Sequence, residues 1–215
     1  MHRYDPARQR LALGLAGLAG LVDATGFVVA GGYFTSFMSG NTTRMGVELL
    51  ERPGLALLPL GLIAFFLAGV IIGALVLRRV RGRHKRVLLG LVAGLLGAGA
   101  GLLLVGWPLS FLGLSAMAMG LANNVFSREG EVTVGVTYMT GALVRFGQGI
   151  AAKLYGQPLS GSRGYGLLWS ALALGAAAGG ALCLVDPLVA ASTGLMVAIT
   201  LWGFAFAVEA ESAAA

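Results

Sequence analysis

Residues 36–46 of the chain, SFMSGNTTRMG, recur in altered form as residues 137–147, TYMTGALVRFG. Four of the eleven aligned positions are identical, and four more exchange chemically similar side chains. The shared arginine, Arg44 and Arg145, is hard to obtain by chance because both copies lie in apolar sequence. The offset of 101 residues therefore predicts that the chain contains two copies of one structural unit.

The composition indicates a membrane protein. The 215 residues are 57% hydrophobic and 11% charged, and the mean hydropathy is +0.85. A soluble domain carries about 25% charged residues, so this chain has too few to cover the surface of a globule. These values disfavour a soluble enzyme, a DNA-binding module and a disordered chain.

Six apolar runs are long enough, or nearly so, to cross a bilayer. They are Leu11–Gly32, Leu55–Leu77, Val87–Trp107, Leu109–Phe126, Gly166–Val185 and Leu188–Val208. The same offset carries 11–32 onto 112–133, 55–77 onto 156–178 and 87–107 onto 188–208. We therefore predict one membrane domain, residues 1–215, built from repeat 1 (11–107) and repeat 2 (109–208). The repeat also makes the basic, apolar N-terminus one half of an internal pair, which favours a retained span over a signal peptide.

Two further segments, 33–51 and 132–153, are apolar but interrupted by polar residues. Each is predicted to be a short extended piece, at 34–37 and 132–138, followed by a short helix. Ser39 and Thr140 stand where a helix N-cap is expected. The helices 41–51 and 142–153 would be about 16–18 Å long, half the thickness of a bilayer. Their N-termini are therefore expected near the midplane.

The charges indicate the topology, because cytoplasmic loops are rich in Lys and Arg. If both interrupted segments re-enter on the side from which they came, eleven basic residues lie inside and only Arg52 lies outside. Those eleven are Arg3, Arg8, Arg10, the six Lys and Arg of residues 78–86, Lys153 and Arg163. If both segments cross instead, the split is six against six. The charges favour an all-α fold of six transmembrane helices plus two re-entrant strand/half-helix segments, with both termini cytoplasmic. With three crossings each, the repeats would be inverted, as in many transporters.

The predicted binding site lies between the two half-helix N-termini, whose free N–H groups and positive dipole ends favour anions. Asp23 and its counterpart Asn124 fall midway along the first span of each repeat, and charges inside a membrane indicate function by default. The candidate residues are Asp23, Ser39, Gly40, Asn41, Thr42, Arg44, Asn124, Thr140, Gly141 and Arg145. Purely structural alternatives remain open. Arg44 could pair with Glu48 or Asp23, and Arg145 with Glu129 or Glu131.

One known family shares these motifs. Residues 22–27, VDATGF, and residues 37–46, FMSGNTTRMG, resemble the signature of the YoaK family of small bacterial integral membrane proteins. The second copy keeps Thr140-Gly141 but has Ala142 in place of Asn41. The resemblance covers nearly the whole chain and implies about six spans in a bacterial inner (plasma) membrane, without indicating a substrate. A looser analogy joins the half-helices to nucleobase and sulfate transporters, which are larger.

We expect a secondary transporter of a small, anionic solute, with Asp23 as the coupling or gating acid. An ion channel built from the same parts and a non-transporting scaffold or lipid-binding protein are the alternatives. An enzyme is not expected, because no catalytic cluster of His with Ser or Cys occurs. No cofactor or metal site is expected either, and the single Cys183 excludes an internal disulfide. The expected partners are the solute and the lipid bilayer, with a homodimer as an option and no nucleic acid.

Overall fold

The computed structural model describes residues 5–80, 82–128, 131–132, 135–156 and 162–214. This part of the chain is helical except for one small hairpin. The helices are α1 (Pro6–Val29), α2 (Met38–Glu51), α3 (Leu57–Arg79), α4 (His84–Leu104), α5 (Pro108–Ala122), α6 (Met139–Leu154), α7 (Arg163–Cys183) and α8 (Pro187–Ala214). The two-residue strands β1 (Ser127–Arg128) and β2 (Glu131–Val132) pair antiparallel.

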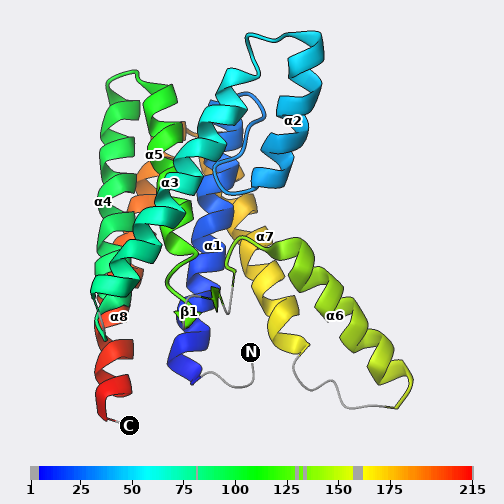
Figure 1. Cartoon of the computed structure of the whole chain (residues 1–215), viewed down its shortest axis with the longest axis vertical. Coiled ribbons are helices and arrows are strands. Elements are labelled where there is room, and N and C mark those ends of the chain that lie inside the picture. The colour runs from blue at the N-terminus through cyan, green and yellow to red at the C-terminus, as the bar shows by residue number, and fades with distance from the viewer. Residues whose placement is uncertain (1–4, 81, 129–130, 133–134, 157–161, 215) are drawn as a thin grey trace.

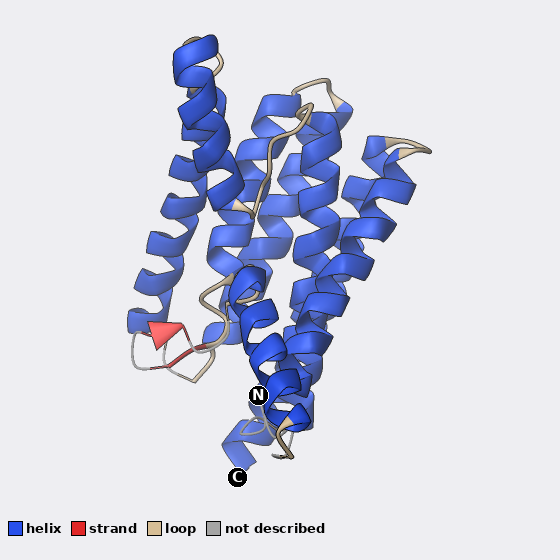
Figure 2. Ribbon diagram, turned by 90° about the vertical axis from the view of Figure 1, so that its right-hand side faces the viewer, coloured by secondary structure: helices blue, strands red, loops and turns tan. Residues whose placement is uncertain are grey.

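Five of the described helices are long and apolar enough to cross a membrane: α1, α3, α4, α7 and α8. They stand side by side and roughly upright, and both chain termini lie at the same end (Figures 1 and 2). The sixth predicted span, 109–126, is only partly helical, because α5 has 15 residues and is about 22 Å long. Asn123 ends it by donating from its side-chain amide to the carbonyl oxygen of Met119 at 3.0 Å, which satisfies an unpaired C-terminal carbonyl.

The helices pack in matched combinations. Helix α1 packs on α7 and α8, and α5 packs on α3 and α4, while α4 also packs on α8. Glycines allow the closest approaches. A Cβ atom on Gly20 of α1 would overlap the backbone of α7 at Leu172, and one on Gly120 of α5 would overlap the backbone of α3 at Phe66. Small residues let membrane helices approach in this way.

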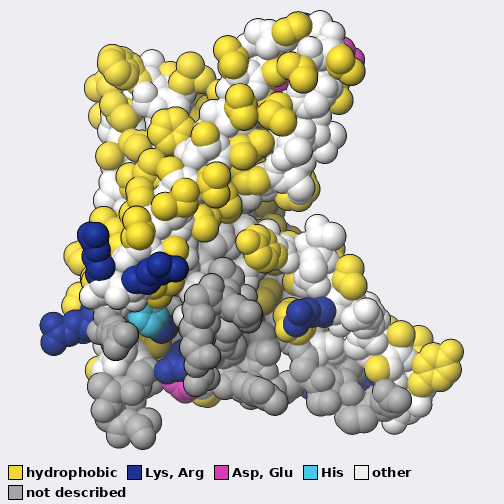
Figure 3. All heavy atoms as spheres, viewed as in Figure 1, with side chains coloured by type: hydrophobic (Ala, Val, Ile, Leu, Met, Phe, Trp, Pro, Cys, Tyr) yellow, Lys and Arg dark blue, Asp and Glu magenta, His cyan; other side chains and the backbone are white. Residues whose placement is uncertain are grey.

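Helix α1 is the most enclosed span, and α3 and α7 are the least. Leu11, Leu15 and Leu18 of α1 and Leu88 and Val92 of α4 are all buried in one continuous core. Hydrophobic side chains also cover much of the visible outer surface, whereas Lys and Arg gather in its lower part, toward the end that holds both termini (Figure 3). This is the surface expected of a protein whose outside faces lipid.

Helices α2 and α6 lie at opposite ends of the molecule, each beside a longer partner (Figure 1). Helix α2 packs on α3, and α6 packs on α7. The prediction of helix starts at 41 and 142 was wrong, because the helices begin at Met38 and Met139. The predicted extended pieces are also absent among the described residues. Within 34–37 the backbone bends at Thr35 and Ser36. Among the described residues of 132–138 only Val132 lies in a strand, and 133–134 lie outside the described residues.

Candidate functional site

A cavity of about 290 Å³ lies between the starts of α2 and α6. Its lining comes from both copies of the repeated motif, with Phe66 of α3 added. The residues are Ser36, Phe37, Met38 and Ser39 from the first copy and Thr137, Tyr138, Met139, Thr140 and Gly141 from the second. Four pairs of these residues stand 101 positions apart, so corresponding parts of the two copies border the same space.

The described lining residues carry hydroxyl groups, aromatic rings and thioethers, and no formal charge. Ser39 and Thr140 occupy matching positions in the first turns of the two helices, and both are exposed. Ser36, in contrast, is only 5% exposed. The cavity therefore offers hydrogen-bonding groups and apolar surface side by side, which is typical of small-molecule sites.

The N-termini of α2 and α6 border this cavity without side-chain caps. Phe37 and Tyr138 occupy the N-cap positions, and neither makes a side-chain capping hydrogen bond. The prediction that Ser39 and Thr140 are N-caps was wrong, since both lie inside their helices. An uncapped N-terminus has backbone N–H groups without a side-chain partner, which can bind a ligand's electronegative atoms, although in α2 those of Met38 and Gly40 already donate to the carbonyl oxygens of Ser36 and Phe37.

Asp23 of α1 holds the segment that precedes α2. One oxygen of its carboxylate accepts the backbone N–H groups of Thr35 and Ser36, both at 2.8 Å, and the Thr35 hydroxyl at 3.3 Å. Since Ser36 lines the cavity, Asp23 positions part of the cavity wall. The carboxylate is engaged by the protein itself and does not line the cavity.

Asn124, the counterpart of Asp23, makes different contacts. Its side-chain amide donates to the carbonyl oxygens of Val70 at 3.2 Å and Gly120 at 3.4 Å, which joins α3 to the end of α5. The neighbouring Asn123 instead accepts the hydroxyl of Thr137 at 3.2 Å. Thr137 matches Ser36 by the offset of 101, so each half anchors the same cavity position through a different side chain.

Asn41, Gly40 and Thr42 shape the start of α2 outside the cavity lining. The buried amide of Asn41 accepts the backbone N–H of Phe34 at 2.9 Å and donates to its carbonyl oxygen at 2.7 Å. Gly40 lies against the rings of Phe34 and Phe37, where a Cβ would collide. Thr42 is exposed and donates to the carbonyl oxygen of Met38 at 2.9 Å. These contacts fold the segment back on itself.

Arg44 also engages protein groups. It donates to the carbonyl oxygen of Gly32 at 2.6 Å, lies 4.4 Å from the centre of the Tyr33 ring and pairs with Glu48 at 3.6 Å. The buried Glu48 accepts the hydroxyl of Tyr33 at 2.6 Å. The alternative pairing with Glu48 is therefore present. Gly32 has a φ of +110°, and a Cβ there would collide with the Arg44 guanidinium, so a glycine is required.

Arg145 lies on the exposed surface of α6. It donates to the hydroxyl of Tyr165 on α7 at 2.6 Å, and its guanidinium carbon lies 5.1 Å from the centre of that ring. Of the acids considered as partners, Glu129 lies outside the described residues. Neither matched arginine lines the cavity.

The structure thus brings three predicted residues, Ser39, Thr140 and Gly141, into one cavity. Asp23 contacts its wall, and the other six candidates do not line it. Phe66 and the matched residues 36–38 and 137–139 were not among the site residues predicted from the sequence. The repeat itself was the signal for the matched ones, since they belong to the aligned stretch. No cluster of metal-ligating side chains occurs among the described residues.

Comparison with known proteins assigns the chain to a protein family. Residues 11–207 match a family described as a protein of unknown function (DUF1275). The chain belongs to this DUF1275 family. The match confirms the resemblance to the YoaK family, which the motifs at 22–27 and 37–46 had indicated.

A relative of this DUF1275 protein is the UPF0700 transmembrane protein RA0705 of Rhizobium meliloti (strain 1021). The two are 34% identical over 149 residues, which is 66% of this chain. The match spans 64% of that relative's length. No solved structure matches. The transmembrane relative and the five long apolar helices together make the chain a multi-pass membrane protein.

Proposed function

We propose that the chain forms two inverted repeats, in which α2 and α6 are re-entrant half-helices. The helix contacts support this, because exchanging α1, α2, α3 and α4 for α5, α6, α7 and α8 reproduces the pattern. The pair α1–α7 becomes α5–α3, α1–α8 becomes α5–α4, and α2–α3 becomes α6–α7. Helices α2 and α6 are about 21 and 24 Å long, shorter than a core of about 30 Å, and length alone does not set them apart from α5, which is about 22 Å long.

The same arrangement gives an orientation. The basic residues gather toward the end that holds both termini, and Arg78, Arg79, Arg83, Lys85 and Arg86 flank the α3–α4 turn. The preference for Lys and Arg in cytoplasmic loops favours a cytoplasmic position for this end. The proposed location is therefore the inner membrane of a bacterium. The re-entrant segment with α2 would lie in the outer half of the membrane, and the one with α6 in the cytoplasmic half.

Within this frame the protein is a secondary transporter of a small solute, and the cavity is its binding site. The observation that carries the proposal is the lining: matched residues of the two inverted copies meet around about 290 Å³ of space. In transporters built from inverted repeats, the solute binds near the midplane between the repeats, at the ends of broken helices. A cavity bordered equally by both repeats can open to either side when one repeat moves against the other.

The solute is proposed to be a small anion. Two helix N-termini without side-chain caps border the cavity, and their dipoles attract negative charge. The hydroxyls of Ser39 and Thr140 can add hydrogen bonds to it. Arg44 and Arg145 act at a distance from the solute, by holding α2 to residues 32–33 and α6 to α7. Asp23 sets the position of the cavity wall through Thr35 and Ser36.

Flux into proteoliposomes tests this function. Purified protein is reconstituted, and a panel of small anions (chloride, nitrate, sulfate, formate, acetate and lactate) is applied to vesicles with and without protein. We expect uptake of at least one anion that depends on the protein and saturates with its concentration. Uptake that rises without saturation would identify a channel instead. Vesicles inert to the whole panel would contradict an anion carrier and favour the scaffold alternative.

A further inference from the structure

A second recess lies far from the central cavity, on the outer surface where the start of α4 meets α8. It measures about 410 Å³ and is lined by seven residues that we call the α4–α8 groove. They are Arg83, Arg86, Val87, Gly90 and Leu91 of α4 and its N-cap, and Trp202 and Phe206 of α8. The groove is therefore basic at one end and apolar along the rest.

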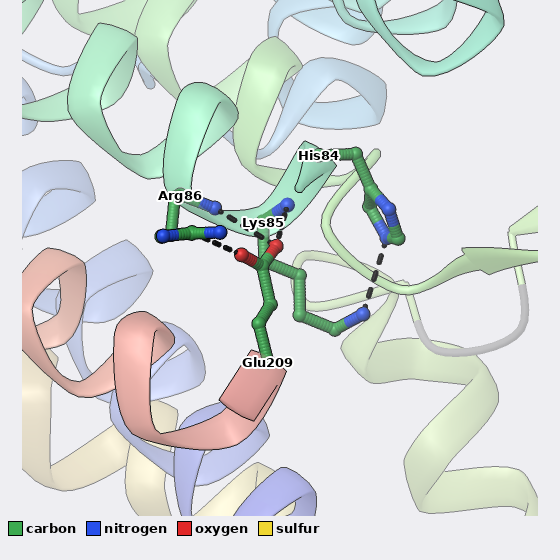
Figure 4. A network of polar contacts seen from close by, with 4 residues as sticks. All are labelled: His84, Lys85, Arg86 and Glu209. Carbon is green, nitrogen blue, oxygen red and sulfur yellow. Dashed lines mark hydrogen bonds and ion pairs between the residues drawn. The ribbon is translucent and has the colours of Figure 1, made fainter. Parts of the chain in front are cut away.

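The basic end is held in place by a buried carboxylate (Figure 4). Glu209 of α8, 8% exposed, accepts the backbone N–H groups of Lys85 at 2.8 Å and Arg86 at 3.3 Å, and its other oxygen contacts the Arg86 Nε at 2.5 Å. The guanidinium carbon of Arg86 lies 4.9 Å from the centre of the Phe206 ring. Arg86 is thus fixed between an acid and an aromatic ring.

Among the described side chains at this end, cations outnumber acids. Arg83 is exposed, and Lys85 and His84 follow it on the first turn of α4, where their side-chain nitrogens lie 3.1 Å apart. Glu209 can balance one of these charges, and it forms an ion pair with Arg86. No acid in the part of the chain that the structure describes forms an ion pair with Arg83, which therefore stays available to an anion from outside.

The apolar part continues from the basic end along both helices. Val87, Leu91, Trp202 and Phe206 are all partly exposed, between 36% and 46%. Gly90 opens the space between them, since a Cβ there would lie 3.1 Å from the Trp202 indole nitrogen. The rings of Trp202 and Phe206 meet edge to face with centres 6.0 Å apart.

We propose that the α4–α8 groove binds one anionic phospholipid. The phosphate would contact Arg83 and the outward side of the Arg86 guanidinium, and an acyl chain would lie along Val87, Leu91 and Trp202. Charge complementarity selects this occupant over a neutral lipid, because guanidinium groups bind phosphate strongly and a basic recess between membrane helices suits an anionic headgroup. The proposal stands independently of transport.

Fluorescence quenching of Trp202 measures this binding directly. The chain has three tryptophans, so Trp107→Phe and Trp169→Phe leave Trp202 as the single reporter. The protein is reconstituted in phosphatidylcholine that contains increasing amounts of brominated phosphatidylglycerol, whose bromines quench nearby indoles. We expect stronger quenching than the lipid fraction alone predicts, and stronger than with brominated phosphatidylcholine at the same fraction.

Arg83→Ala should lower the preference for phosphatidylglycerol about fivefold, because one basic residue near a membrane contributes about 1 kcal/mol. Arg83→Lys should keep most of it. The matched control is Arg79→Ala, which removes one exposed charge from the same end but outside the groove. Equal loss in Arg83→Ala and Arg79→Ala would show attraction to general surface charge and overturn the proposal. Equal quenching by the two brominated lipids in the parent protein would overturn it as well.

Discussion

Ser39 and Thr140 line the same cavity although 101 residues separate them in the sequence. Each lies in the first turn of a short helix that begins one residue earlier, at Met38 and Met139. The arginine of each motif follows its hydroxyl residue by five positions, which is roughly 140° around a helix. When the hydroxyl residue of each helix faces the cavity, this angle therefore turns the arginine of the same helix away from it.

Asp23 is expected to stabilise the fold through Thr35 and Ser36. Asp23→Ala removes an acceptor from two backbone N–H groups and should lower the free energy of unfolding by about 2–3 kcal/mol. Asp23→Asn keeps a carbonyl oxygen, and asparagine occupies the matching position 124, so it should cost less than half as much. Unfolding of the detergent-solubilised protein by a denaturing detergent measures both. Equal losses of unfolding free energy in the two variants would show that the negative charge of Asp23, and not its acceptor oxygen, stabilises the fold.

Arg44 is expected to stabilise α2 by compensating Glu48. Arg44→Ala leaves this buried carboxylate with the Tyr33 hydroxyl as its described partner and should cost about 1–2 kcal/mol, since the Arg44 side chain is 40% exposed. The double variant Arg44→Ala/Glu48→Gln should recover part of the loss, because a neutral amide still accepts the tyrosine. Arg145→Ala, on the exposed surface of α6, is the control and should change stability by less than about 0.5 kcal/mol. No recovery in the double variant would contradict the pairing.

Gly120 is expected to permit the contact between α5 and α3. Gly120→Ala places a methyl group against the Phe66 carbonyl and 3.0 Å from the Val70 nitrogen, which should cost about 2–3 kcal/mol through helix separation. Gly94→Ala on α4 is the matched control, because nothing lies within 4 Å of its added Cβ. The control should be neutral or slightly stabilising. The same unfolding assay compares them, and a Gly120→Ala protein as stable as the control would argue against the close contact.

Much of the fold follows from the sequence because its main signals are long-range and redundant. Apolar runs predict where helices lie, and the repeat at offset 101 assigns them to matching sets. The ends of the elements depend on single hydrogen bonds that no periodicity encodes. Asn123 shortens α5 by binding the Met119 carbonyl, and α2 begins at Met38 without the expected serine cap.

The candidate site was partly predictable for the same reason. The repeat nominated Ser39, Thr140 and Gly141, which line the cavity. Arg44 and Arg145 were also predicted as site residues, because a charge in an apolar segment indicates function and the repeat alone does not show in which direction the side chain points. The angle of roughly 140° between positions 39 and 44 of a helix follows from the sequence, and it could have distinguished the hydroxyl residues that line the cavity from the arginines that do not. The inward position of Phe66 depends on how α3 packs, which no local pattern shows.

The proposed function requires that the solute binds in the cavity between the two matched motifs. The most direct test measures initial rates of uptake into proteoliposomes for Gly141→Phe and Gly147→Phe. Both glycines lie on α6 with open space around an added Cβ, but only Gly141 lines the cavity. We predict that Gly141→Phe lowers saturable uptake about tenfold or more, since a ring in the site opposes solute binding by an overpacking cost of about 1–3 kcal/mol. Gly147→Phe should transport like the parent protein, and equal rates for the two variants would contradict a binding site in this cavity.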